Sequence, residues 1–99
     1  MVNVRQWNLY VLLPWPEYIA GRQLAKEYQR ATCKKIYYGT LYTDMRRLVE
    51  LGYAEANDRE DEDGKIREFR KKADGGRPEK PKQLKEKESL EGIILPEPA

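Results

Sequence analysis

The feature that most constrains the fold of this chain is an amphipathic stretch over residues 39–51, followed at once by a glycine. Leu41, Met45 and Leu48 are spaced at i, i+4 and i+7, which places them on one face of a helix. Gly52 stands where a left-handed helix stop favours a residue without Cβ. The pattern therefore predicts one helix with a clearly defined end.

The opposite face of this helix is polar. We expect Thr40 to cap its N-terminus, because a Ser or Thr side chain can accept a hydrogen bond from the first free backbone N–H groups. Taken alone, such a face is typical of any surface helix in contact with solvent. Its polar members are Thr43, Asp44, Arg46, Arg47 and Glu50.

A β-hairpin is expected directly after this helix. Residues 53–56 have the composition of a short strand, and residues 65–70 alternate in a way that predicts a second one. An acidic turn over residues 57–64 separates them and ends in Asp63-Gly64, a common tight-turn dipeptide. Together these segments predict a two-stranded β-wing.

Two further helices are expected upstream, over residues 3–13 and about 20–31, from apolar residues at helical spacing. Prolines at positions 14 and 16 end the first of them. Helix, helix, helix and hairpin is the element order of a winged helix-turn-helix. The sequence therefore predicts a small α+β domain over residues 1–75, with three helices and a two-stranded wing.

Residues 76–99 have a different composition, rich in Lys, Glu and Pro and poor in apolar side chains. Such a segment cannot bury enough surface to offset the entropy lost on ordering, so we interpret it as a flexible tail. Its one apolar patch is residues 92–96. This patch is either a peptide that docks on a protein partner or a chain end without a role.

Composition narrows the possible chemistry. The chain has 99 residues, 39% of them apolar, no histidine and one cysteine, Cys33. Nucleophile pairs that need histidine are excluded, and a zinc site would rest almost wholly on carboxylates. We therefore expect no enzyme, no metal and no cofactor. Cys33 is either a redox-sensitive thiol beside two lysines or an ordinary small residue at a helix end.

The sequence also bears on location and charge. It has no apolar run long enough to cross a bilayer and no signal-peptide pattern at its start, so we expect a cytoplasmic protein without a membrane partner. The net charge is only +2, but its distribution is uneven. Basic residues exceed acidic ones in residues 1–56 and 65–75, on either side of the acidic turn.

Several of these segments resemble the PadR-like winged-helix transcription regulators, over about residues 8–75. The resemblance rests on Gly-Arg-Gln-Leu-Ala-Lys at 21–26, on Gly-Thr-Leu-Tyr at 39–42, and on Arg-Arg-Leu-Val-Glu-Leu-Gly-Tyr at 46–53. Thr43 stands where that family usually has Pro, the second wing strand lacks the usual Tyr-rich ending, and the C-terminal dimerisation helix has no counterpart. The resemblance implies a compact DNA-binding module and a homodimer.

A winged helix-turn-helix inserts its third helix in the major groove of double-stranded DNA, where side chains reach base edges. We expect the helix over 39–51 to act in this way, as part of a sequence-specific transcriptional regulator. Tyr42 is assigned either to a phosphate contact or to the core. The predicted DNA-binding residues are Lys34, Lys35, Tyr37, Tyr38, Thr40, Tyr42, Thr43, Arg46, Arg47, Lys65 and Arg67.

Two acidic features count against DNA binding, and a second function is considered beside it. Asp44 would repel phosphate unless it pairs with Arg47 or accepts from cytosine, and the acidic wing tip is expected to point away from DNA. The alternative is a winged-helix adaptor that binds another protein through the acidic wing and the apolar patch at 92–96. Trp7, Tyr10 and Trp15 are assigned either to a dimer interface or to the core.

Overall fold

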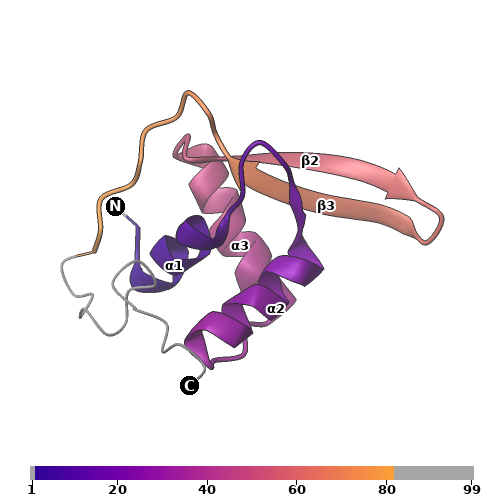
Figure 1. Ribbon diagram of the computed structural model, residues 1–99, viewed down its shortest axis with the longest axis horizontal. Helices are drawn as coiled ribbons and strands as arrows, with labels where there is room; N and C mark the ends of the chain where they lie inside the picture. Colours follow the sequence, from indigo (N-terminus) through magenta and orange to yellow (C-terminus); the bar gives the residue numbers. More distant parts are fainter. Residues whose placement is uncertain (1, 82–99) are drawn as a thin grey trace, which may run out of the picture.

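The computed structural model describes residues 2–81 and shows a small α+β domain in which three helices pack against one end of an antiparallel sheet (Figure 1). The described elements are, in chain order, α1 (Val4–Leu12), β1 (Ile19–Ala20), α2 (Gly21–Thr32), α3 (Tyr38–Glu50), β2 (Ala54–Asp61) and β3 (Gly64–Lys71).

The three helices lie where the apolar spacing predicts them. The N-terminus of α1 is closed by a capping box, in which the Asn3 side chain accepts from the Gln6 N–H at 2.7 Å and the Gln6 side chain accepts from the Asn3 N–H at 3.1 Å. The expected left-handed stop after α3 is confirmed, since Gly52 has φ +85°. The expected cap at Thr40 is wrong: α3 begins at Tyr38, its N-cap residue is Tyr37, and Thr40 lies inside the first turn.

The sheet has three strands rather than the two that the sequence predicts. Its order is β1-β3-β2, and all neighbours are antiparallel. The additional strand β1 has only two residues, Ile19 and Ala20, which pair with Phe69 and Glu68 of β3. A strand of two residues is too short to show an alternating pattern in the sequence. Its conformation also depends on a partner almost fifty residues away.

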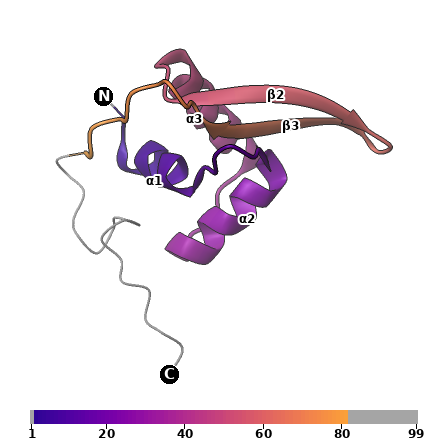
Figure 2. The same ribbon diagram turned by 45° about the horizontal axis from the view of Figure 1, so that its top comes forward.

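The hairpin, which we define as residues 54–71, differs from the expected one in length and in its turn. Both strands have eight residues, and they run well past the helical body (Figure 2). The two connecting residues are Glu62 and Asp63, so Gly64 is the first residue of β3, where it pairs with Asp61 and has φ +120°. The predicted acidic turn is therefore wrong: residues 57–61 belong to β2.

The core lies between the three helices and the end of the sheet that is closest to them. Trp7 is 2% exposed and belongs to it, whereas Tyr10 is partly buried and Trp15 is 56% exposed. The fully buried large side chains are Trp7, Phe69, Leu9, Leu24, Leu41, Met45 and Leu48.

The first residues of the predicted tail are also described. Pro78 and Pro81 are buried, and the Arg77 guanidinium lies 5.4 Å from the centre of the Trp7 ring. The remainder of the tail, with the apolar patch at 92–96, lies outside the described residues.

Candidate nucleic-acid interface

The exposed face of α3 carries hydroxyl and guanidinium groups. Thr43, Arg46 and Arg47 are all exposed there, and each arginine lies about one helical turn after Thr43. The Thr43 hydroxyl donates to the Gly39 carbonyl at 2.9 Å, which leaves its oxygen free to accept. Arg47 lies 3.8 Å from Glu50 in the last turn, and Arg46 has no ion-pair partner within residues 2–81. Both guanidinium groups are thus open to an external anion.

Asp44 does not lie on this face, although the sequence places it there. It is 2% exposed and is turned towards α1, where it accepts from the Arg5 Nε. Its Oδ1 accepts from Arg5 Nη2 and from Gln6 Nε2, each at 3.2 Å. The hydrogen bond to Asp44 raises the pKa of Arg5, so the guanidinium keeps its positive charge beside the carboxylate. The carboxylate that argued against DNA binding is therefore neutralised inside the protein.

The turn before α3 places two tyrosines at the surface. Ile36 is buried and anchors this turn, whereas Tyr37 is 69% and Tyr38 51% exposed. Lys34 and Lys35 are exposed as well, and the Lys35 Nζ lies 5.5 Å from the centre of the Tyr37 ring. This distance is within the range of a cation–π contact.

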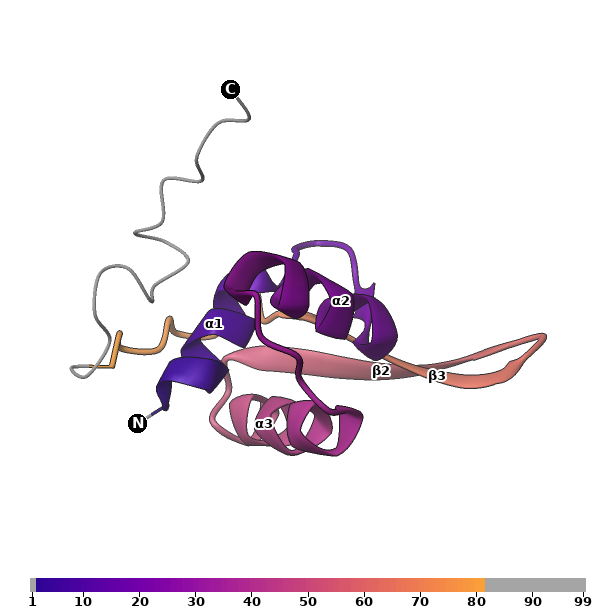
Figure 3. The same ribbon diagram turned by 90° about the horizontal axis from the view of Figure 1, so that it is seen from below.

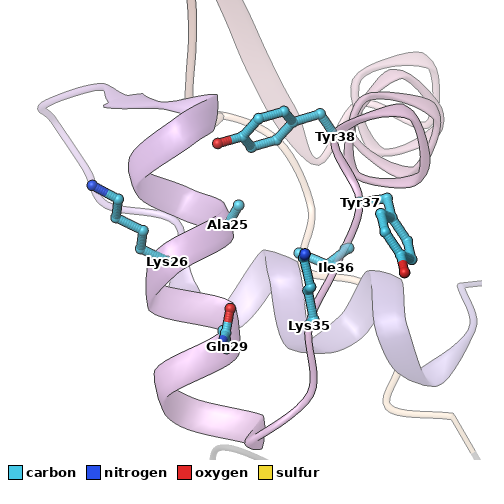
Figure 4. A pocket seen from close by; sticks show the side chains of 7 residues that line it. All are labelled: Ala25, Lys26, Gln29, Lys35, Ile36, Tyr37 and Tyr38. Atoms are coloured by element: carbon cyan, nitrogen blue, oxygen red, sulfur yellow. The ribbon is translucent and has the colours of Figure 1, made fainter.

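A groove of about 330 Å³ runs between this turn and α2 (Figure 4). Ala25 and Ile36 form its apolar part, and the groove is otherwise lined by Lys26, Gln29, Lys35, Tyr37 and Tyr38. In Figure 4 the Tyr38 ring extends towards α2, while the Tyr37 ring points to the other side of the chain. Gln29 was not anticipated, although it lies three residues after Lys26 and so on the same side of α2.

Tyr42 packs inside the domain. Its ring centre lies 6.0 Å from that of Phe69, and a Cβ built on Gly21 would approach the Tyr42 hydroxyl oxygen to 2.6 Å. A glycine at position 21 thus gives the ring its space, because any side chain there would displace it. Of the two roles considered for Tyr42, the structure shows the packing one. Thr40 is only half-buried at the side of the same helix.

The two predicted basic residues of the hairpin, Lys65 and Arg67, are exposed. Arg67 is bonded to Asp58 on the facing strand, with Nε 2.9 Å from Oδ1 and Nη2 3.3 Å from Oδ2. Lys65 stands opposite Glu60 in the strand register. The basic residues of the hairpin are therefore matched by acidic ones.

Seven of the predicted site residues are exposed in the turn before α3 or on the helix itself: Lys34, Lys35 and Tyr37 before it, and Tyr38, Thr43, Arg46 and Arg47 on it. Figure 3 shows the start of α3 on the side of the domain from which the hairpin projects. The structure sets apart Tyr42, which packs on Phe69, Thr40, which is half-buried, and Lys65 and Arg67, which lie on the hairpin.

Comparison of the chain with models of known protein families, with curated proteins and with solved structures gave no match. Within residues 2–81, no helix is both long enough and apolar enough to cross a membrane. The same residues contain no group of three or more acidic, histidine or cysteine side chains arranged to hold a metal ion. The function must therefore be argued from the geometry of the surface.

Proposed function

We propose that this protein is a winged helix-turn-helix DNA-binding protein that regulates transcription by reading a duplex sequence with α3. The element order α1-β1-α2-α3-β2-β3 and the sheet order β1-β3-β2 support this fold assignment. A hairpin that extends past the helices, beside the start of α3, has the position of a wing. From the PadR-like resemblance, the proposal takes only the DNA-binding module.

The observation that carries the proposal is the charge on the exposed face of α3. Between residues 38 and 47 the only carboxylate is that of Asp44, and it is buried against Arg5. What this part of the helix presents to solvent is therefore neutral or positive. DNA binding needs such a surface, because the phosphate backbone supplies much of the affinity and repels carboxylates.

An α-helix fits the major groove, where Arg pairs with guanine and Thr can contact the thymine methyl. On this basis Thr43, Arg46 and Arg47 are assigned to base edges. Lys34 and Lys35, just before the helix, are assigned to phosphates on the groove edge, where contacts fix the register of the protein without reading the sequence.

The test is selection of bound sequences from a pool of random duplexes, followed by affinity measurements on the selected duplex and on a scrambled one. We expect a specific site, bound at least about 10³-fold more tightly than the scrambled duplex. Arg46→Ala and Arg47→Ala should each weaken the selected complex by about 1–3 kcal/mol if the residue reads a base.

Lys72→Ala is the matched control, because Lys72 is an exposed base beyond β3, at the opposite end of α3 from its start. Its loss should reduce binding by no more than the general effect of one positive charge. If no sequence is enriched, or if the Arg46 and Arg47 variants bind as well as the wild type, the α3 reading is refuted.

The second candidate is a protein-interaction adaptor, which the exposed aromatic residues favour: Trp15, Tyr37 and Tyr38 are all more than half exposed. Aromatic side chains are enriched at protein interfaces. Elution from immobilised random duplex in a salt gradient separates the two functions. Release at a rising salt concentration supports DNA binding, and passage without retention supports the adaptor. Sedimentation of the same sample tests the expected homodimer.

A further inference from the structure

The two faces of the hairpin can be assigned from its register. Side chains alternate between faces along a strand, so Phe69, Arg67 and Lys65 lie on the same face of β3. Phe69 packs on Tyr42 of α3. The face that carries Arg67 and Lys65 is therefore the one on which α3 packs at Phe69, and Figure 3 shows α3 on one side of the hairpin.

Acidic residues of β2 stand directly opposite these two bases. Asp58 pairs with Arg67 in the register and bonds to it through both of its oxygens, at 2.9 and 3.3 Å. Glu60 pairs with Lys65. The hydrogen bonds to Asp58 raise the pKa of Arg67, and the same contact lowers the pKa of Asp58, so both partners are charged at neutral pH.

The other face of the hairpin is matched in the same way. Arg70 Nε lies 2.7 Å from an oxygen of Glu55, and Arg59 Nε lies 3.3 Å from an oxygen of Glu68. The three arginines of the hairpin, Arg59, Arg67 and Arg70, are thus each engaged by a carboxylate on the facing strand. A hairpin with this arrangement has little net attraction for phosphate on either face.

We propose that Asp58 is a specificity-determining residue, which holds Arg67 and, together with the charge of Glu60 opposite Lys65, suppresses contact of the hairpin with DNA phosphates of any sequence. This inference rests on the proposed function of α3. A guanidinium that is bonded to a carboxylate through two N–H groups has lost its best donors for a phosphate, and the carboxylate itself repels the phosphate.

The physical consequence is a lower affinity for non-specific DNA. Non-specific binding comes almost entirely from phosphate contacts, and each additional contact steepens the dependence of affinity on salt. What matters for a regulator is the ratio of specific to non-specific binding, because the genome presents a vast excess of competing sites. A hairpin whose arginines are paired with its own carboxylates keeps this ratio high by leaving recognition to α3.

The experiment measures binding of the full chain to a 24-base-pair duplex of random sequence, by fluorescence anisotropy over a series of salt concentrations. Asp58→Asn keeps the size of the side chain and removes its charge. We expect it to tighten binding about 3- to 10-fold at low salt and to steepen the log–log salt slope by about 1, the value for one new phosphate contact.

Two further variants assign the effect to Arg67. Asp74→Asn removes one exposed acid beyond the hairpin and controls for net charge; it should change the affinity less than 2-fold, as expected for a distant surface charge under screening. Arg67→Ala in the Asp58→Asn background should cancel the gain, whereas Arg67→Ala in the wild type should have little effect.

The inference is overturned if Asp58→Asn binds like the wild type, if Asp74→Asn gives an equal gain, or if the gain survives the loss of Arg67. Each of these results leaves the role of α3 intact, because the wild type still binds duplex DNA in a salt-dependent way. Failure of the proposed function gives a different result: neither the wild type nor any variant binds the duplex at low salt.

Discussion

Asp44 offers the most direct test of how the structure places α3. Its carboxylate is 2% exposed and accepts from both Arg5 and Gln6. A hydrogen bond to a charged group contributes about 1.5–3 kcal/mol to stability. The Arg5 side chain is 44% exposed, so solvent screening reduces its share. We therefore expect Asp44→Ala to lower the free energy of unfolding by about 2–3 kcal/mol.

This loss is a large part of the stability of a domain of this size, which is roughly 5–10 kcal/mol. It corresponds to a fall in Tm of about 10–20 °C. Urea denaturation followed by tryptophan fluorescence measures it, because Trp7 is 2% exposed and reports on the core. Glu50→Ala is the matched control on the same helix: the Glu50 side chain is 57% exposed, and its loss should cost less than about 0.5 kcal/mol.

A double-mutant cycle with Arg5→Met then isolates the ion pair. Methionine keeps much of the apolar stem of arginine and removes its charge. We expect a coupling energy of about 1–2 kcal/mol between Asp44 and Arg5, within the range for residues in one hydrogen-bond network. A coupling energy below about 0.3 kcal/mol, or an Asp44→Ala variant as stable as Glu50→Ala, would show that Asp44 faces solvent and that the helix is rotated.

Four further outcomes follow from individual positions. Gly21→Ala should cost about 1–3 kcal/mol in a urea melt, because its Cβ would meet the Tyr42 ring, and Tyr42→Leu should recover part of the loss. Gly52→Ala should cost about 1–2 kcal/mol at φ +85°. Cys33→Gly should stabilise by about 0.5–1 kcal/mol, since Cys33 has φ 58° at the end of α2; a less stable variant would contradict this. Burial raises the pKa of the Tyr28 hydroxyl. The contribution of Tyr28 to stability is therefore present below its unfolded pKa of about 10 and is lost as the pH rises through its folded pKa. Tyr28→Phe should thus unfold at a higher pH than the wild type in an alkaline titration.

The helices could be predicted from the sequence because their apolar residues recur within one or two turns. Leu41, Met45 and Leu48 are all fully buried, as their spacing requires, and Gly52 ends the series in the left-handed conformation. These features depend on neighbours in the chain. The extent of each helix was therefore predicted to within one or two residues.

The differences arise where a residue depends on a distant partner. Asp44 has the spacing of a surface residue, but Arg5, which makes its burial favourable, lies 39 positions earlier. The acidic run at 58–61 looks like a loop, yet it forms a strand because each of its members stands opposite a residue of β3. Cross-strand pairs of opposite charge can offset the low β-propensity of acidic residues.

The candidate site also combines features that depend on chain neighbours with features that depend on distant residues. The exposure of Lys34, Lys35, Tyr37 and Arg47 follows from local position, and the sequence predicts it. The groove beside Tyr37 needs α2 and the turn to be placed together, and no local pattern defines it. The pairing of each hairpin arginine with a carboxylate is likewise visible only once the strand register is known.

The central claim is that the exposed face of α3 contacts DNA, and chemical-shift mapping tests it residue by residue. A ¹⁵N-labelled sample of the full chain is titrated with a duplex at low salt. We predict that the largest changes fall at Thr43, Arg46 and Arg47 and in the turn at Tyr37. Changes confined to α1, or an unchanged spectrum at saturating duplex, would contradict the account.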